Sequence, residues 1–323
     1  MVDDFSYLNA RVRARRSSLL KEGFFQEALD LSFPDFLRLL SESPYGQDLA
    51  GQGLVEVDRA ISRTQARLVG DLPRLAGGRA GEVVGLLFLR GDLHNLQALL
   101  RAKATGRPFE DIPLMVGTLK EELWRQAYEA QDPAGMAQVL SVPGHPLAQA
   151  LRGALRETQD LVQVEALLAK RFFEEVALGA KALEEPFLRD YLALEVDAEN
   201  LRTAFKLRGQ EVVPEAVFIR GGRFLDRVRF TRLLEGDYTA LDELSGTPLG
   251  ALSGVRDLKE LEKRLRCLLL KEARRGIADP LEAGFVLAYV REREWEAMRL
   301  RLLARRAYFG LPRAQVEEEV TCP

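Results

Sequence analysis

Side chains that could do chemistry are few in this sequence, and they are scattered. The only two histidines, His94 and His145, lie far apart, and neither has the spacing of a metal ligand. The adjacent acids Glu121 and Glu122 have no histidine or metal-binding cluster beside them, so they do not make an acid–base pair. We therefore expect no catalytic residue and no metal site.

A phosphate-binding loop is also missing. No segment has the form G-x-x-x-x-G-K-[ST], and no serine lies in a Gly-x-Ser-x-Gly turn. The nearest glycine cluster, residues 77–81, lacks the lysine and the preceding strand, so it is typical of a turn between helices. We expect a chain that needs no cofactor and that neither binds ATP tightly nor hydrolyses it.

The composition is that of a globular protein. Hydrophobic residues make up 47% of the 323 residues and charged residues 29%, and the net charge is −3. No apolar run approaches the roughly 20 residues of a membrane span. Two cysteines are too few for a disulfide framework, which favours a reducing cytoplasm. No leader segment is recognised at the start.

Basic residues gather in two places, residues 11–16 and 299–306. Acids accompany the second cluster, so a salt-bridged helix face is the favoured interpretation. A protein partner with an acidic surface is the next alternative, and a nucleic-acid backbone is the third. With the acidic net charge, we expect no nucleic-acid partner.

Helical periodicity runs through the whole chain and predicts an all-α fold. Leu258, Leu261 and Leu265 recur at three- and four-residue steps among charged residues, as on one face of an amphipathic helix. No convincing run of alternating β-branched residues occurs. Glycines and prolines separate the helical runs.

Three sequence marks recur about one hundred residues apart, which indicates an internal repeat. Each mark is a short pattern of residue types, and the marks follow one another in a fixed order along the chain. The marks are a glycine before an apolar pair (Gly117, Gly222), a proline turn (Pro44, Pro146, Pro248), and an acid three residues before a polar or small residue (Asp92 with Asn95, Asp197 with Asn200, Glu294 with Ala297).

The repeats predict three helical units, residues 1–107, 108–210 and 211–323. Three similar units in one chain favour closed, pseudo-threefold packing. An acid and an amide three positions apart share one helix face. With apolar neighbours that face is partly buried, so we expect Asp92, Asn95, Asp197, Asn200 and Glu294 to fix helix crossings in the core. Direct contact with a partner is the alternative.

The three proline turns are unusually apolar for loops. Each carries one large side chain directly after its proline: Tyr45, Leu147 and Leu249. Exposed apolar groups mark interfaces, so these residues are candidate partner-binding residues at one end of the molecule. The alternative is that they tuck under neighbouring helices as part of the core.

The order and spacing of these marks resemble the C subunit of prokaryotic V-type (A-type) ATPases, a relative of the d subunit of the eukaryotic vacuolar proton pump. The similar segments lie along nearly the whole chain: Tyr45-Gly46-Gln47-Asp48-Leu49, His94-Asn95-Leu96 through Gly106, His145-Pro146-Leu147-Ala148, Leu194-Glu195-Val196-Asp197 and Arg291-Glu292-Arg293-Glu294-Trp295-Glu296-Ala297. The departure is Ala297, where the family usually has asparagine.

The resemblance implies a non-catalytic rotor part with the shape of a helical funnel. Its expected partners are the central shaft subunits and the membrane proteolipid ring, and torque between them would drive proton or sodium transport. The expected location is cytoplasmic, peripheral to the membrane, with no span of its own. The rival interpretations are a cytoplasmic helical scaffold or regulatory adaptor without any motor, and a nucleic-acid-binding protein.

Overall fold

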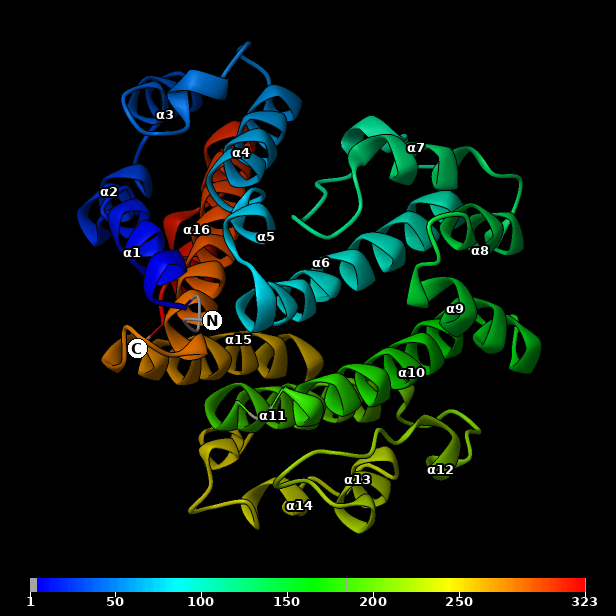
Figure 1. Cartoon of the computed structure of the whole chain (residues 1–323). Coiled ribbons are helices and arrows are strands. Elements are labelled where there is room, and N and C mark those ends of the chain that lie inside the picture. Colours follow the sequence, from blue (N-terminus) through cyan, green and yellow to red (C-terminus); the bar gives the residue numbers. More distant parts are fainter. Residues whose placement is uncertain (1–4, 184, 323) are drawn as a thin grey trace. The chain divides into compact units, whose positions relative to one another are not determined.

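The computed structural model describes residues 5–183 and 185–322. Every regular element among them is a helix, either α or 3-10, and none is a strand (Figure 1). The prediction of an all-α chain is confirmed for this part of the sequence. Positions 1–4, 184 and 323 of the predicted repeat units lie outside the described residues.

The contacts within the chain group the residues into two compact units. Unit 1 takes residues up to 92, residues 110–118, and everything from 273 on. Unit 2 takes residues 93–109 and 119–272. Unit 1 therefore joins the two ends of the chain. The division into three repeats at 107/108 and 210/211 is a different division, and it stays a prediction.

Unit 1 contains the first helices of the chain and the last ones. The early elements are α1 (Phe5–Arg16), α2 (Glu22–Ala28), α3 (Phe33–Ser41), η1 (Gly46–Asp48), α4 (Leu54–Val69) and α5 (Leu72–Leu75). The late elements are η4 (Arg275–Ala278), α16 (Ala283–Phe309) and α17 (Arg313–Val320). The long helix α6 (Gly78–Thr105) begins in this unit and continues into unit 2, and η2 (Phe109–Asp111) follows it.

Unit 2 is built from the same kinds of element, namely short helices, proline turns and long helices. Its elements are α7 (Glu121–Glu129), α8 (Pro133–Ser141), α9 (Pro146–Glu157), α10 (Leu161–Ala182), α11 (Pro186–Leu207), α12 (Pro214–Val217), α13 (Arg227–Leu234), α14 (Thr239–Asp242), η3 (Pro248–Leu252) and most of α15 (Leu258–Arg274). The helices α10 and α11 pack side by side, and α13 packs on α11.

The ends of several helices follow from their local sequence. Asp132, Asp160 and Asp226 accept hydrogen bonds from backbone N–H groups three residues on, which starts α8, α10 and α13. At the other end, Gly106 and Gly310 follow α6 and α16 with positive φ values of 69° and 64°. Glycine adopts this left-handed backbone without a Cβ clash, so the chain can turn away there.

The core of unit 1 forms around α16. The helices α1, α2, α3 and α4 all contact it, and Figure 1 shows α1, α2 and α4 close to the orange-to-red ribbon of α16. Apolar side chains from both chain ends interdigitate there. The buried members include Phe25, Phe36 and Ile61 from the early helices, Tyr45 from the first proline turn, and Leu300, Leu303 and Val316 from the late helices. The late helix α16 thus supplies part of the apolar core against which α2, α3 and α4 pack.

Two further observations bear on the predicted compartment. No helix in the part of the chain that the structure describes is long and apolar enough to cross a bilayer. Neither Cys267 nor Cys322 is a free thiol, so cysteine usage gives no support to the expectation of a reducing environment.

Candidate functional site

Asp197 on α11 holds the segment that leads into α13. Its carboxylate is fully buried and accepts the backbone N–H groups of Arg223, Phe224 and Leu225 at 3.0, 2.9 and 3.1 Å. Gly222 lies so close that a Cβ there would be 2.0 Å from the Asp197 Oδ1 atom. Burial raises the pKa of Asp197 to about 6, although the three N–H donors oppose that rise.

Asp92 on α6 makes the matching arrangement before α7. Its buried carboxylate accepts the backbone N–H of Thr118 at 2.9 Å and the hydroxyl of the same residue at 2.5 Å. A Cβ on Gly117 would lie 2.0 Å from the Asp92 Oδ1 atom. Two sequence marks that were identified separately, the acid and the glycine, therefore meet in the structure. We call such a carboxylate an anchoring acid.

The amides of the same mark are also buried. Asn200 donates to the carbonyl of Ile219 at 2.9 Å and accepts the N–H of the same residue at 2.8 Å. Asn95 occupies the equivalent place on α6 and is buried as well. Together with Asp197, Asn200 therefore holds the loop backbone against α11 within unit 2.

The third member of the mark is placed differently from the prediction. The side chain of Glu294 is 25% exposed and forms an ion pair only three residues back, with Arg291 at 2.8 Å. Glu296 is the buried acid, with a side chain only 4% exposed. It accepts the backbone N–H of Leu20 at 2.6 Å, just before α2. The anchoring role assigned to Glu294 therefore belongs to Glu296.

Glu296 differs from the other two anchoring acids in that side chains as well as a backbone N–H from the far end of the chain bind it. It accepts the Tyr45 hydroxyl at 2.6 Å and pairs with the Nη1 atom of Arg293 at 2.7 Å. Gln65 donates in turn to the Tyr45 oxygen at 2.8 Å. Burial, with the nearby Glu296 carboxylate, raises the pKa of Tyr45 well above its usual value, so the phenol stays protonated and continues to donate.

A hydrogen bond from a backbone N–H to a side chain two residues earlier closes each of the three proline turns. The Oγ atom of Ser43 accepts the N–H of Tyr45 at 3.2 Å, and Oγ1 of Thr247 accepts that of Leu249 at 3.2 Å. In the second turn Nδ1 of His145 accepts the N–H of Leu147 at 3.3 Å. These three residues were not identified from the sequence, although a polar side chain directly before each proline was the signal for them.

The candidate partner-binding residues Tyr45, Leu147 and Leu249 are all fully buried in their own units. As the chain stands, none of the three presents a surface to another molecule. This placement favours the alternative, in which each side chain closes a helical turn as part of the core. A partner contact through them would need the turns to open first.

The basic clusters are occupied by acids and carbonyls of the same unit. Arg299 forms two bonds with Glu22 at 2.8 and 2.5 Å, and Arg305 pairs with Asp58 at 2.8 Å. Arg16 pairs with Glu292 at 3.0 Å. These contacts match the favoured interpretation, a salt-bridged helix face.

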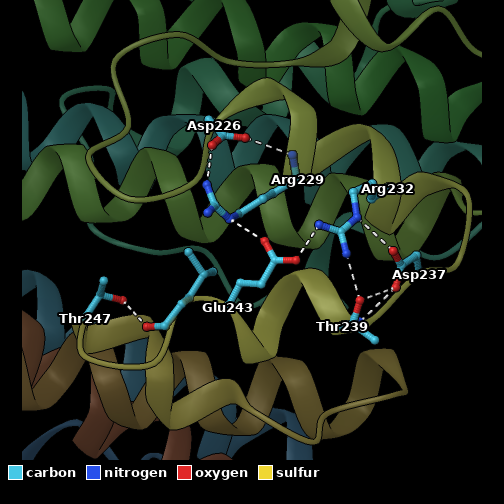
Figure 2. Close-up of polar contacts among 8 residues, drawn as sticks. Asp226, Arg229, Arg232, Asp237, Thr239, Glu243 and Thr247 are labelled. Carbon is cyan, nitrogen blue, oxygen red and sulfur yellow. Dashed lines mark hydrogen bonds and ion pairs between the residues drawn. The ribbon is translucent and has the colours of Figure 1, made fainter.

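A more exposed network links α13 and α14 (Figure 2). Glu243 accepts from Arg232 at 2.5 Å and from Arg229 at 3.1 Å, and Arg232 also pairs with Asp237 at 2.8 Å. The hydroxyl of Thr239 and the Arg232 guanidinium lower the pKa of Asp237 to about 2. Acids and bases alternate here, so each arginine lies between two carboxylates, as is typical of a salt-bridged surface.

The described residues contain no group of three or more histidine, cysteine, aspartate or glutamate side chains that could hold a metal ion. The polar clusters of this part of the chain hold backbone segments and pair charges. Their geometry is that of a framework, in which the buried carboxylates of Asp92, Asp197 and Glu296 already accept N–H, O–H and guanidinium donors.

Comparison with known proteins agrees with the resemblance. Residues 8–319 match the ATP synthase (C/AC39) subunit family. The C subunit of a V-type ATP synthase from Thermus thermophilus is 77% identical over 323 residues, which is 100% of both chains. The corresponding V-type protein of Deinococcus radiodurans is 32% identical, covering 99% of this chain and 92% of its own. The C subunit of an A-type ATP synthase from Halorubrum lacusprofundi is 27% identical, covering 97% and 96%. The chain therefore belongs to the ATP synthase (C/AC39) subunit family, as a structural subunit of that complex and not its catalytic part.

Proposed function

We propose that this chain is a rotor part of a V-type ATPase or ATP synthase, which links the central shaft subunits to the membrane proteolipid ring. Torque passing through it would couple ATP turnover to proton or sodium transport. It would lie at the cytoplasmic face, peripheral to the membrane. The observation that carries the proposal is the family match over residues 8–319.

A part that transmits torque has to keep its shape under load, and the polar framework supports this role. Arg293 is fully buried and is held by Glu296, by the carbonyl of Arg15 at 3.0 Å, and by the hydroxyl of Tyr289 at 3.3 Å. A buried charge that loses its partner is costly, so such a cluster resists displacement. Close-packed helices add low compressibility.

We further propose that the three repeats, residues 1–107, 108–210 and 211–323, pack as a closed pseudo-threefold funnel. The matching anchors Asp92 and Asp197, and the matching turn residues Ser43, His145 and Thr247, support equivalent local structures. An experimental structure of the complex would test this. Repeats related by rotations of about 120° are expected, and an open superhelix of repeats would contradict it.

The rotor role is tested by reconstituting the complex with and without this chain in ion-tight vesicles. With the chain present, ATP hydrolysis should drive ion uptake. Without it, the hydrolytic head and its shaft should come away from the proteolipid ring, and hydrolysis should continue without transport. Coupled transport in a complex that lacks the chain would contradict the proposal.

A further inference from the structure

The anchoring acid on α16 differs from the other two in where its partner lies along the chain. Asp92 and Asp197 hold the segments at Thr118 and Arg223, each 26 residues further on. Glu296 holds Leu20, which lies 276 residues away at the other end of unit 1. The first two anchors thus join neighbouring parts of a continuous chain. The third joins segments with no short covalent connection.

Further polar contacts accompany Glu296 along α16, and all lie within unit 1. Arg16 pairs with Glu292, Glu22 with Arg299, and Asp58 with Arg305. The Arg293 guanidinium also reaches the hydroxyl and the carbonyl of Ser18. Both α16 and the early segment contribute charges of both signs to these pairs. The acid Glu292 of α16 pairs with a base of the early segment, and the bases Arg299 and Arg305 of α16 pair with acids of the early segment.

We propose that residues 16–62 and α16 form a non-covalent clasp in which Glu296 is the central positioning residue. It fixes the start of α2 through Leu20 and the first proline turn through Tyr45. As the counter-ion of the fully buried Arg293, it also keeps the early helices seated on α16. That the clasp bears load rests on the proposed rotor function, whereas its structural role does not.

The chemistry of Glu296 explains why a neutral side chain would not replace it. A carboxylate has enough lone pairs to accept from Leu20, Tyr45 and Arg293 at once. The amide of glutamine keeps one acceptor oxygen but turns the other into a donor, which would face the donors already there. It would also leave Arg293 buried without its charge partner, a costly change.

The test is hydrogen–deuterium exchange on the full-length protein, comparing wild type with Glu296→Gln. Amides in residues 18–48 should exchange at least about tenfold faster in the variant, which corresponds to a local opening eased by about 1.4 kcal/mol. Residues 119–272 of unit 2 should be unchanged. The matched control is Glu294→Gln, two residues away on the same helix, which should exchange like wild type.

A milder variant guards against failure to fold. Tyr45→Phe keeps the buried ring and removes only the hydroxyl that Glu296 accepts. It should speed exchange in the same residues by a smaller factor. The clasp is overturned if Tyr45→Phe leaves the exchange of residues 18–48 unchanged and Glu296→Gln does not fold. It is also overturned if both variants fold and neither changes that exchange. Equal acceleration in both units overturns it too.

The load-bearing part is tested in the reconstituted complex. Glu296→Gln, or Tyr45→Phe if the first variant does not fold, should keep ATP hydrolysis while transporting fewer ions per ATP than Glu294→Gln. Unaltered transport with faster exchange would overturn the load-bearing role. If instead the complex transports ions without this chain at all, the rotor function fails and the clasp stands on the exchange data alone.

Discussion

The backbone N–H of Leu20 donates to the carboxylate of Glu296, 276 residues later in the chain, at 2.6 Å. Because Leu20 lies two residues before the start of α2, this bond ties the entry into α2 to the long helix α16. The same geometry joins Thr118 to Asp92 and Arg223 to Asp197. In all three places a backbone segment is bound to an acid on a long helix.

The first prediction concerns the proline turns. Replacing Tyr45, Leu147 and Leu249 together with aspartate should unfold the protein, since each change buries an unpaired carboxylate in a core site. Circular dichroism should show loss of most helicity at 25 °C. Val142→Asp is the matched control, because this residue of the second turn is 85% exposed. A triple variant with wild-type helicity would mean that the turns can open and present these side chains to a partner.

The second prediction is a pH dependence from Asp197, whose folded pKa is raised to about 6 by burial. The folded state then holds this proton more tightly than the unfolded state does. The contribution of Asp197 to stability is therefore fully present below its ordinary pKa and is lost as the pH rises through about 6. The expected loss is about 3 kcal/mol for a shift of about two units.

Urea unfolding from pH 4 to pH 8 measures this contribution, with Asp197→Asn as the variant that cannot titrate. The free energy of unfolding of the wild type should fall, relative to that of the variant, as the pH rises. A difference that moves the other way would mean that the three N–H donors outweigh burial and hold the pKa below its usual value.

The third prediction concerns the side chains that close the proline turns. Thr247→Ala removes the acceptor for the Leu249 N–H and should destabilise the protein by about 1 kcal/mol, as loss of a helix cap does. Thr247→Ser keeps the hydroxyl and should cost less. Denaturant midpoints at constant slope give both values. If serine and alanine cost the same, the hydroxyl does not hold the turn.

The fourth prediction contrasts two kinds of charge. Arg293→Met should cost about 3–5 kcal/mol, because it leaves Glu296 buried without its cation. Glu243→Gln, in the exposed network of Figure 2, should cost far less, and its effect should fade in high salt. Thermal unfolding at low and high salt separates them. A salt-sensitive loss at Arg293 would show that water reaches that pair.

The fifth prediction is that the purified chain neither binds ATP tightly nor hydrolyses it, because the sequence has no phosphate-binding loop. Equilibrium dialysis and a coupled assay would measure both. The preparation has to be free of the catalytic subunits, so a tagged chain purified under dissociating salt is the suitable sample. Activity that follows the chain through this purification would reveal a site of its own.

Much of the local structure was predictable from residue types. Pro44, Pro146 and Pro248 mark turns because proline cannot continue a helix, and the structure has a turn or a helix start at each. The acids Asp92 and Asp197 were identifiable because an acid and an amide three positions apart share a helix face. The partner of each acid was not predictable, since Thr118 and Arg223 reach it through tertiary packing.

The third occurrence of the acid mark shows the limit of pattern matching. Glu294 fits the spacing of the other acids, but two residues along an α-helix turn the side chain by about 200°. Glu294 is therefore partly exposed, whereas Glu296 lies in the core. Two of the three partners of Glu296, Leu20 and Tyr45, lie about 250 or more positions earlier in the chain. Periodicity within one helix carries no information about such distant partners.

The packing of α2, α3 and α4 against α16 has a consequence during translation. A ribosome releases α2, α3 and α4 long before α16, about 200 residues later. At about 5–20 residues per second, their apolar faces wait on the order of 10–40 s for their partner. We therefore expect the apolar faces of α2, α3 and α4 to stay exposed for most of the time that translation takes.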